Sequence, residues 1–225
     1  MNELLLVVEI LVAFSLILFA KKFFGKEGIF AWIAFASVFA EIQVTKSVDV
    51  LGISGTLGNV LFASNFLATD ILTECYGFKE SKKGVYIALF SVICYLIISQ
   101  LTIAFVPNDI DIVSDSMKTL FSLAPRVCIS STVMFFIANM VDVYFYESLR
   151  KKFDGKKMWL RNNVSTILCN CVENFFFVFG AFLFVYPLID VVMIAVSTSL
   201  IEIIISLCDT PFLYFAKKIK DKEVA

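Results

Sequence analysis

The stretch Val164–Val185, which reads VSTILCNCVENFFFVFGAFLFV, carries a single charged residue, Glu173, near its middle. About 20 mostly apolar residues, at a rise of about 1.5 Å each, cross the hydrocarbon core of a bilayer. A charged side chain is costly at that depth and usually faces a polar cavity or a partner. The stretch therefore predicts a transmembrane helix that brings a carboxylate into a polar protein interior.

Six other stretches have the same character, and the whole chain is 60% hydrophobic and 17% charged, with 25 Phe among its 225 residues. They are Leu4–Ala20, Ile29–Thr45, Leu57–Tyr76, Gly84–Val106, Leu120–Tyr146 and Leu188–Phe215. Together the seven use up most of the chain and leave no soluble catalytic domain. The sequence predicts an all-α, polytopic membrane protein of about seven transmembrane helices, with residues 1–225 as one domain.

Basic residues occupy alternate loops between these stretches. They are Lys21, Lys22 and Lys26, then Lys79, Lys82 and Lys83, then Arg150, Lys151, Lys152, Lys156 and Lys157, and finally Lys217, Lys218, Lys220 and Lys222. The other loops carry acids, as in the long loop Pro107–Thr119. Because positive loops stay in the cytoplasm, we expect the N-terminus outside and the C-terminus inside.

This chain lacks the residues that several kinds of catalytic and binding site require. It contains no His, and its six Cys form no C-x-x-C pair, so buried apolar thiols are favoured over a metal site or disulfides. A phosphate-binding G-x-x-x-x-G-K-[ST] motif is also absent. With no nucleophile–base pair either, the sequence predicts a protein that is not an enzyme and holds no cofactor.

Polar residues recur at helical spacing within four of the stretches, which predicts one polar stripe per helix around a shared pocket. The stripes are Asn65, Thr69 and Thr73 with Asp70 and Glu74 beside them; Thr132, Asn139, Asp142 and Tyr146; Thr166, Asn170 and Glu173; and Ser199, Glu202, Ser206 and Asp209. Amides and hydroxyls can also serve only to join helices. Pairing with nearby opposite charges is an equally open reading for Asp70, Glu74, Asp209, Arg126 and Arg161.

The surplus of acids in the stretches favours a cationic ligand. A carboxylate accepts two parallel hydrogen bonds from an N–H/NH2 edge, which is how proteins read guanine-like rings. Amides such as Asn139 and Asn170 can donate to a ring carbonyl while accepting from an N–H. An aminated, purine-like base fits this chemistry, and so do many other cationic solutes. The two Trp residues, Trp32 and Trp159, are expected at the membrane interface.

Four motifs in order resemble the queuosine-precursor transporters, a vitamin-uptake-transporter-like family of bacterial membrane proteins. They are the run FLATDILTECYG at residues 66–77; Arg126 with Ser130, Ser131 and the N-x-x-D-V of residues 139–143; the run WLRNNVST at 159–166; and the D-T-P-F-x-Y of residues 209–214. The resemblance implies a multi-pass protein of the bacterial cytoplasmic membrane. It also implies six core helices, as in the substrate-binding components of energy-coupling-factor importers, and uptake of a 7-deazaguanine base.

By the same resemblance, the substrate-binding residues are Asp70, Glu74, Arg126, Asn139, Asp142, Arg161, Asn170, Glu173 and Glu202. Three of them depart from the family pattern. Asn139 replaces Gln, Glu173 replaces Asp, and Glu202 replaces a Lys. The shorter amide makes room and the reversed charge can pair with an amine, so we expect queuine or the aminomethyl base in preference to the neutral cyano base.

Two modes of action remain open from the sequence. In one, the chain imports its small-molecule substrate by itself, in contact with membrane lipid and without nucleic acid. In the other, it is the substrate-binding subunit of an ATP-driven energy-coupling-factor importer and needs a separate energising ATPase complex. A homo-oligomer is compatible with either mode.

Overall fold

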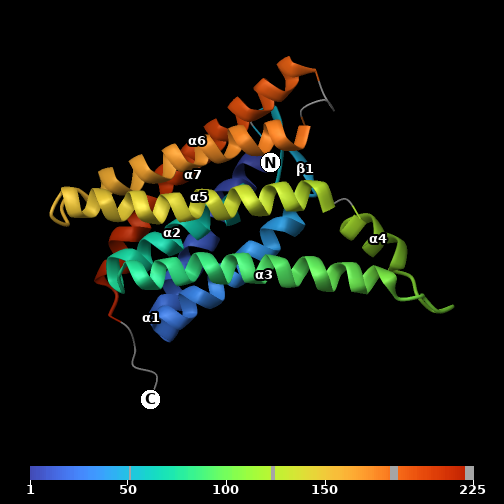
Figure 1. Cartoon of the computed structure of the whole chain (residues 1–225), viewed down its shortest axis with the longest axis horizontal. Coiled ribbons are helices and arrows are strands. Elements are labelled where there is room, and N and C mark those ends of the chain that lie inside the picture. The colour runs from blue at the N-terminus through green and yellow to red at the C-terminus, as the bar shows by residue number, and fades with distance from the viewer. Residues whose placement is uncertain (51, 123–124, 183–186, 221–225) are drawn as a thin grey trace.

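The computed structural model describes residues 1–50, 52–122, 125–182 and 187–220 (Figure 1). Its elements are α1 (Asn2–Gln43), β1 (Ser47–Val50), β2 (Ile53–Thr56), α2 (Asn59–Cys75), α3 (Phe78–Ala104), α4 (Ser114–Ser122), α5 (Pro125–Lys152), α6 (Met158–Phe182) and α7 (Leu188–Lys218). The predicted helical architecture is confirmed. The antiparallel β1–β2 hairpin was not among the predicted elements.

Among the described residues, α1, α3 and α7 are long and apolar enough to cross a membrane by length and composition. Helices α2, α5 and α6 do not meet that criterion, and they carry many of the buried polar side chains. Polar residues lower the apolar character of a helix even when they face the protein interior. The chain is thus a helical membrane protein, and its full number of transmembrane helices remains a prediction.

Helix α1 contains the first two predicted stretches and reverses direction between them. Gly25, with φ 57° and ψ −139°, interrupts the helix. Gln43 Nε2 donates to Glu9 Oε1 at 2.7 Å, although an unbroken helix would hold these residues about 50 Å apart. Gly28 is needed at the same bend, since a Cβ there would lie 2.3 Å from the Ala20 carbonyl oxygen. Residues 2–24 and 26–43 therefore form two antiparallel limbs.

Helix α2 occupies the centre of the fold, where it packs against α1, α3, α5 and α7, while α6 packs between α5 and α7. Buried aliphatic residues such as Ile33, Leu67 and Leu213 fill the space around it. Trp32 belongs to this core, because it is buried and its Nε1 donates to Ser64 Oγ at 3.1 Å. The expectation of an interfacial Trp32 is wrong, whereas Trp159 is exposed.

The predicted basic and acidic loops gather at opposite ends of the molecule. Lys21 Nζ donates to the Ile219 carbonyl at 2.9 Å, and Lys26 lies 3.5 Å from Glu80. These contacts join the bend of α1, the start of α3 and the end of α7 at one end, which we call the basic end. The N-terminus, the hairpin and α4 lie away from it, at the acidic end (Figure 1).

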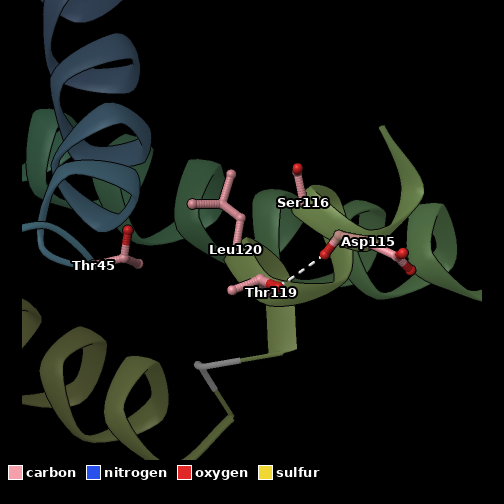
Figure 2. Close-up of a pocket in the computed structure, with 5 residues that line it drawn as sticks. All are labelled: Thr45, Asp115, Ser116, Thr119 and Leu120. Atoms are coloured by element: carbon pink, nitrogen blue, oxygen red, sulfur yellow. Dashed lines mark hydrogen bonds between the residues drawn. The ribbon is translucent and has the colours of Figure 1, made fainter. Parts of the chain in front are cut away.

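The long acidic loop Pro107–Thr119 is partly helical, because α4 begins within it at Ser114. Asp111 precedes α4, and its Oδ1 accepts hydrogen bonds from the backbone N–H groups of Val113 at 2.8 Å and Ser114 at 2.9 Å. These bonds hold the pKa of Asp111 below its usual value. Figure 2 shows residues of α4, among them Asp115 and Thr119, lining a surface groove that Thr45 also borders.

Candidate functional site

The polar stripes of α2, α5, α6 and α7 face one another inside the bundle. Among the described residues, seventeen polar side chains from these helices are each at most 8% exposed: Ser64, Asn65, Thr69, Asp70, Thr73, Thr132, Asn139, Asp142, Arg161, Asn162, Ser165, Thr166, Asn170, Asn174, Glu202, Ser206 and Asp209. Large apolar residues such as Phe176, Leu200 and Ile204 point outward from the same helices. The structure therefore has a polar interior surrounded by an apolar exterior.

At the basic end, Glu74 of α2 joins four side chains from three other helices. Its Oε1 accepts from Arg161 at 2.6 Å and from the Tyr146 hydroxyl at 3.1 Å, and its Oε2 accepts from Lys217 at 3.2 Å. Arg150 adds an ion pair at 3.7 Å. We call these five residues the Glu74 hub. Their contacts hold α2, α5, α6 and α7 together where the polar interior meets the basic end.

Arg161, which is fully buried, is the central cation of the hub. It also donates to the Gly155 carbonyl at 3.2 Å, and its guanidinium lies 5.3 Å from the centroid of the Tyr146 ring. For Glu74 and Arg161, the structure therefore shows the ion pairing that the sequence had left open. Their assignment as substrate-binding residues remains a proposal.

One turn further along α2 from the hub lies Asp70, which is 1% exposed. Asp142 of α5 and Asp209 of α7, both equally buried, act on it electrostatically, as do Glu74 and Arg161. We call Asp70, Asp142 and Asp209 the aspartate cluster. It brings three acids from three helices into one region, yet the nearest buried cation is already paired with Glu74.

Hydrogen-bond donors are scarce around this cluster. Within the described part of the chain, neither Asp70 nor Asp142 accepts a hydrogen bond of good geometry, although the Ser165 hydroxyl lies beside Asp142. Asn162 Nδ2 donates to Asp209 Oδ1, while Asp209 Oδ2 and Asn162 Oδ1 find no donor. Buried polar atoms are nearly always hydrogen-bonded in native proteins, so these acceptors require donors beyond the N–H and O–H groups that the described residues direct at them.

A second acidic group lies nearer the acidic end. Glu202 precedes Asp209 by seven residues on α7, or about 10 Å along the helix. It accepts a hydrogen bond from Asn174 Nδ2 at 2.6 Å, and it acts electrostatically on Glu173, as does Glu41 of α1. We call Glu41, Glu173 and Glu202 the glutamate group. Glu173 is only half-buried, because it also borders an apolar groove of about 250 Å³ between α5 and α6.

Amides lie on the helices between the two acidic groups. Asn170 of α6 donates to Ser206 Oγ of α7 at 3.2 Å, and its own Oδ1 lacks a donor among the described residues. Asn139 of α5 is buried and donates to the Phe135 carbonyl of its own helix at 2.9 Å. The side chain of Arg126 lies outside the described residues.

Four residues that belong to or contact the two acidic groups were missing from the predicted site: Glu41, Asn162, Asn174 and Asp209. Asp209 was assigned to the stripe of α7, but pairing with a surface cation was an equal alternative. Asn162 belongs to the run WLRNNVST, and only its bond to Asp209 reveals its place. Asn174 lies four residues after Asn170 and eight after Thr166, so helical periodicity does place it on their face of α6. It was missed because the neighbouring carboxylate Glu173 was chosen to end that stripe.

Two comparisons with known proteins give matches. Residues 56–216 match the family model described as "Putative vitamin uptake transporter". The chain is 37% identical over 209 residues to a protein of Bacillus subtilis (strain 168) named "Probable queuosine precursor transporter", covering 92% of this chain and 91% of that protein. No solved structure matches the chain. The family and the relative are transporters, which confirms the prediction that the chain is not an enzyme.

Proposed function

Because the chain belongs to the vitamin uptake transporter family, we propose that it imports a 7-deazaguanine precursor of queuosine across the cytoplasmic membrane. The matched region takes in α2 to α7, and with them nearly all of the polar interior. The name of the Bacillus subtilis relative supports the substrate class. The chemistry of the interior supports it independently.

The observation that carries the proposal is the surplus of buried acceptors over donors. Near the acidic end, Glu173 and Glu202 carry carboxylates, and Oδ1 of Asn170 on α6 lacks a donor among the described residues. A deazaguanine ring presents a row of N–H groups on its amidine edge, and a carboxylate accepts two of them in parallel. A ligand rich in donors therefore complements this interior, whereas a ligand rich in acceptors does not.

We assign the base-binding role to the part of the interior near the acidic end. Glu173 and Glu202 supply carboxylates there, Asn170 supplies an amide oxygen that lacks a described donor, and Asn139 lies on the facing helix. The glutamate group gathers three acids beside one another, which favours a ligand that carries an amine. The preferred substrates are therefore queuine or the aminomethyl base, in agreement with the charge reversal at Glu202.

In the proposed topology, seven transmembrane segments cross the membrane, with the two limbs of α1 as the first two. The acidic end faces outward and the basic end faces the cytoplasm. The base enters from the acidic end, and the Glu74 hub closes the opposite end. Release into the cytoplasm then requires the hub contacts to separate.

Uptake of labelled substrate tests the function. Bacterial cells without their own queuosine-precursor transporter, expressing this chain, should accumulate radiolabelled queuine and aminomethyl base above cells with empty vector. Asp190→Asn, a change at an exposed residue of α7, serves as the matched control and should transport normally. If neither base accumulates although this chain and the control variant are both present in the membrane, the proposed substrate class is wrong.

Purification from native membranes tests whether the chain acts alone. A chain that imports by itself should purify without stoichiometric ATPase subunits. Copurification of an ATPase pair would instead identify a substrate-binding subunit of an energy-coupling-factor importer.

Cysteine labelling tests the orientation. In a variant without native Cys, a cysteine introduced by Asp111→Cys should react with an impermeant thiol reagent in intact cells. One introduced by Lys156→Cys should react only after the membrane is opened. The reverse pattern would overturn the orientation.

A further inference from the structure

We infer that the aspartate cluster of Asp70, Asp142 and Asp209, together with the amide of Asn162, is a proton-binding site separate from the base-binding glutamate group. The site holds at least one exchangeable proton at neutral pH. Its part in coupling proton movement to import rests on the proposed function, but the binding of the proton does not. The argument follows from burial, from hydrogen bonding and from distance.

Burial leaves the three carboxylates without enough compensating charge. Asp70 and Asp209 are 1% exposed and Asp142 is fully buried. The charged groups that act on Asp70 are the other two aspartates, Glu74 of its own helix and Arg161 of α6. The neutral titratable groups that face the cluster are Tyr146 of α5 and Cys169 of α6. Arg161 forms its 2.6 Å contact with Glu74. Burying several ionised carboxylates costs far more free energy than the single Arg161–Glu74 ion pair can offset. Such carboxylates normally take up protons instead.

A neutral side chain within the cluster gives a second, independent indication. Asn162 is fully buried, and its Nδ2 points at Asp209, so its amide lies within the cluster. The other end of the amide, Oδ1, accepts no hydrogen bond from any described residue. A neutral acceptor has no charge that requires compensation, but it does require a donor. An O–H on a neighbouring carboxyl group would be such a donor.

Among the described residues, the acidic side chains do not converge as metal ligands do. No group of three His, Cys, Asp or Glu side chains is close enough together to hold one metal ion. A proton needs only a pair of neighbouring oxygen atoms, and one carboxyl group can donate it to another. The arrangement therefore suits a shared proton better than a coordinated cation.

Position separates this site from the base. The cluster lies next to the Glu74 hub and about 10 Å along α7 from Glu202. Two members of the glutamate group are less buried than the cluster, since Glu202 is 8% exposed and Glu173 is half-buried, whereas Glu41 is 1% exposed. A base entering from the acidic end meets the glutamates first. A proton bound by the aspartates would reduce the uncompensated negative charge beside the hub. It would thereby lower the free-energy cost of burying that charge.

Infrared spectroscopy of the purified full-length protein tests the site without any substrate. At neutral pH the wild type should show the C=O band of a protonated carboxyl group, and the band should disappear at alkaline pH. The near-isosteric variants Asp70→Asn, Asp142→Asn and Asp209→Asn should lose part or all of this band, while the exposed control Asp190→Asn should keep it. A wild type without the band, or a band that survives in all three variants, would overturn the proposal.

A sodium site would give a different outcome. Sodium would then stabilise the wild type against thermal unfolding, Asp70→Asn would abolish that effect, and no protonated band would appear. This result would also overturn the proton assignment.

Vesicle measurements separate the failure of this inference from that of the proposed function. Protein in vesicles with an internal pH dye should acidify the interior when the aminomethyl base is added outside, and Asp70→Asn should abolish this proton uptake. A band that depends on the aspartates without any base uptake would support the proton site and refute the transport proposal. Base uptake without the infrared band and without proton movement would support the transport proposal and refute the proton site.

Discussion

Glu74 and Asp70 lie one turn apart on α2 and are almost equally buried, but their surroundings are opposite. Glu74 accepts hydrogen bonds from Arg161, Tyr146 and Lys217, whereas Asp70 accepts none from the described residues. The difference indicates different roles for two acids that the sequence alone does not distinguish. A carboxylate held by buried cations joins helices and is costly to leave unpaired, whereas one without partners is available for a mobile ligand.

The largest effect on stability is expected when the hub loses its buried cation. Arg161→Ala leaves Glu74 in the interior with the neutral Tyr146 hydroxyl and two more exposed cations, Lys217 and Arg150. Removing one member of a buried ion pair typically costs about 3–5 kcal/mol of the free energy of unfolding. Thermal unfolding of the purified protein in detergent should therefore show a large loss of stability.

The paired variant Arg161→Met with Glu74→Gln provides the control for that prediction. Replacing both charges removes the uncompensated carboxylate, so this protein should be more stable than Arg161→Ala alone. Equal destabilisation in the two proteins would show that Arg161 acts through its packing on Tyr146 and not through its charge.

The next largest effect is expected on ligand selection, at Glu202. Glu202→Lys places an ammonium group beside Glu173, with which it can pair, so the fold should tolerate the change. Cationic queuine and the aminomethyl base would lose an attraction and gain a repulsion. Their affinity should therefore fall by about ten-fold or more. The neutral cyano base should be affected much less.

Competition binding to the folded variant measures this selectivity. Equal weakening of all three bases would show that Glu202 serves helix packing through Asn174. The preference for an amine-bearing substrate would then lose its main support.

A smaller effect is expected at Glu173. Glu173→Gln retains the size of the side chain, but it places an amide donor against the N–H edge of the base. The lost charge-assisted hydrogen bond corresponds to about 1.5–3 kcal/mol, or roughly ten-fold to a hundred-fold in affinity. Calorimetric titration with the aminomethyl base measures it, and unchanged affinity would remove Glu173 from the site.

The sequence predicted the helical membrane architecture because long apolar stretches have few other uses. It predicted the charge separation of the two ends because loop charges alternate. It did not resolve which acids are paired, since Glu74 and Asp70 share a helix, a residue class and a motif. That distinction depends on Arg161, which is 87 residues from Glu74 in sequence and reaches it at 2.6 Å.

The hairpin and α4 were missed for a different reason. They are short segments between apolar stretches, so hydrophobic periodicity gives little signal there. The kink of α1 at Gly25 was anticipated only as a boundary between two stretches. Its tightness depends on the approach of Gly28 to the Ala20 carbonyl, which no pattern in the sequence reveals.

The smallest effect is expected from Lys217, which contacts the same carboxylate as Arg161 but is half exposed. Lys217→Ala removes a 3.2 Å contact with Glu74 Oε2, and solvent-exposed ion pairs contribute only about 0–1 kcal/mol. Thermal unfolding should therefore change little, and added salt should reduce even that difference, because exposed charges are screened. A loss as large as that of Arg161→Ala would show that the hub depends on the number of its cations. The contrast between buried and exposed partners would then no longer explain why Glu74 and Asp70 differ.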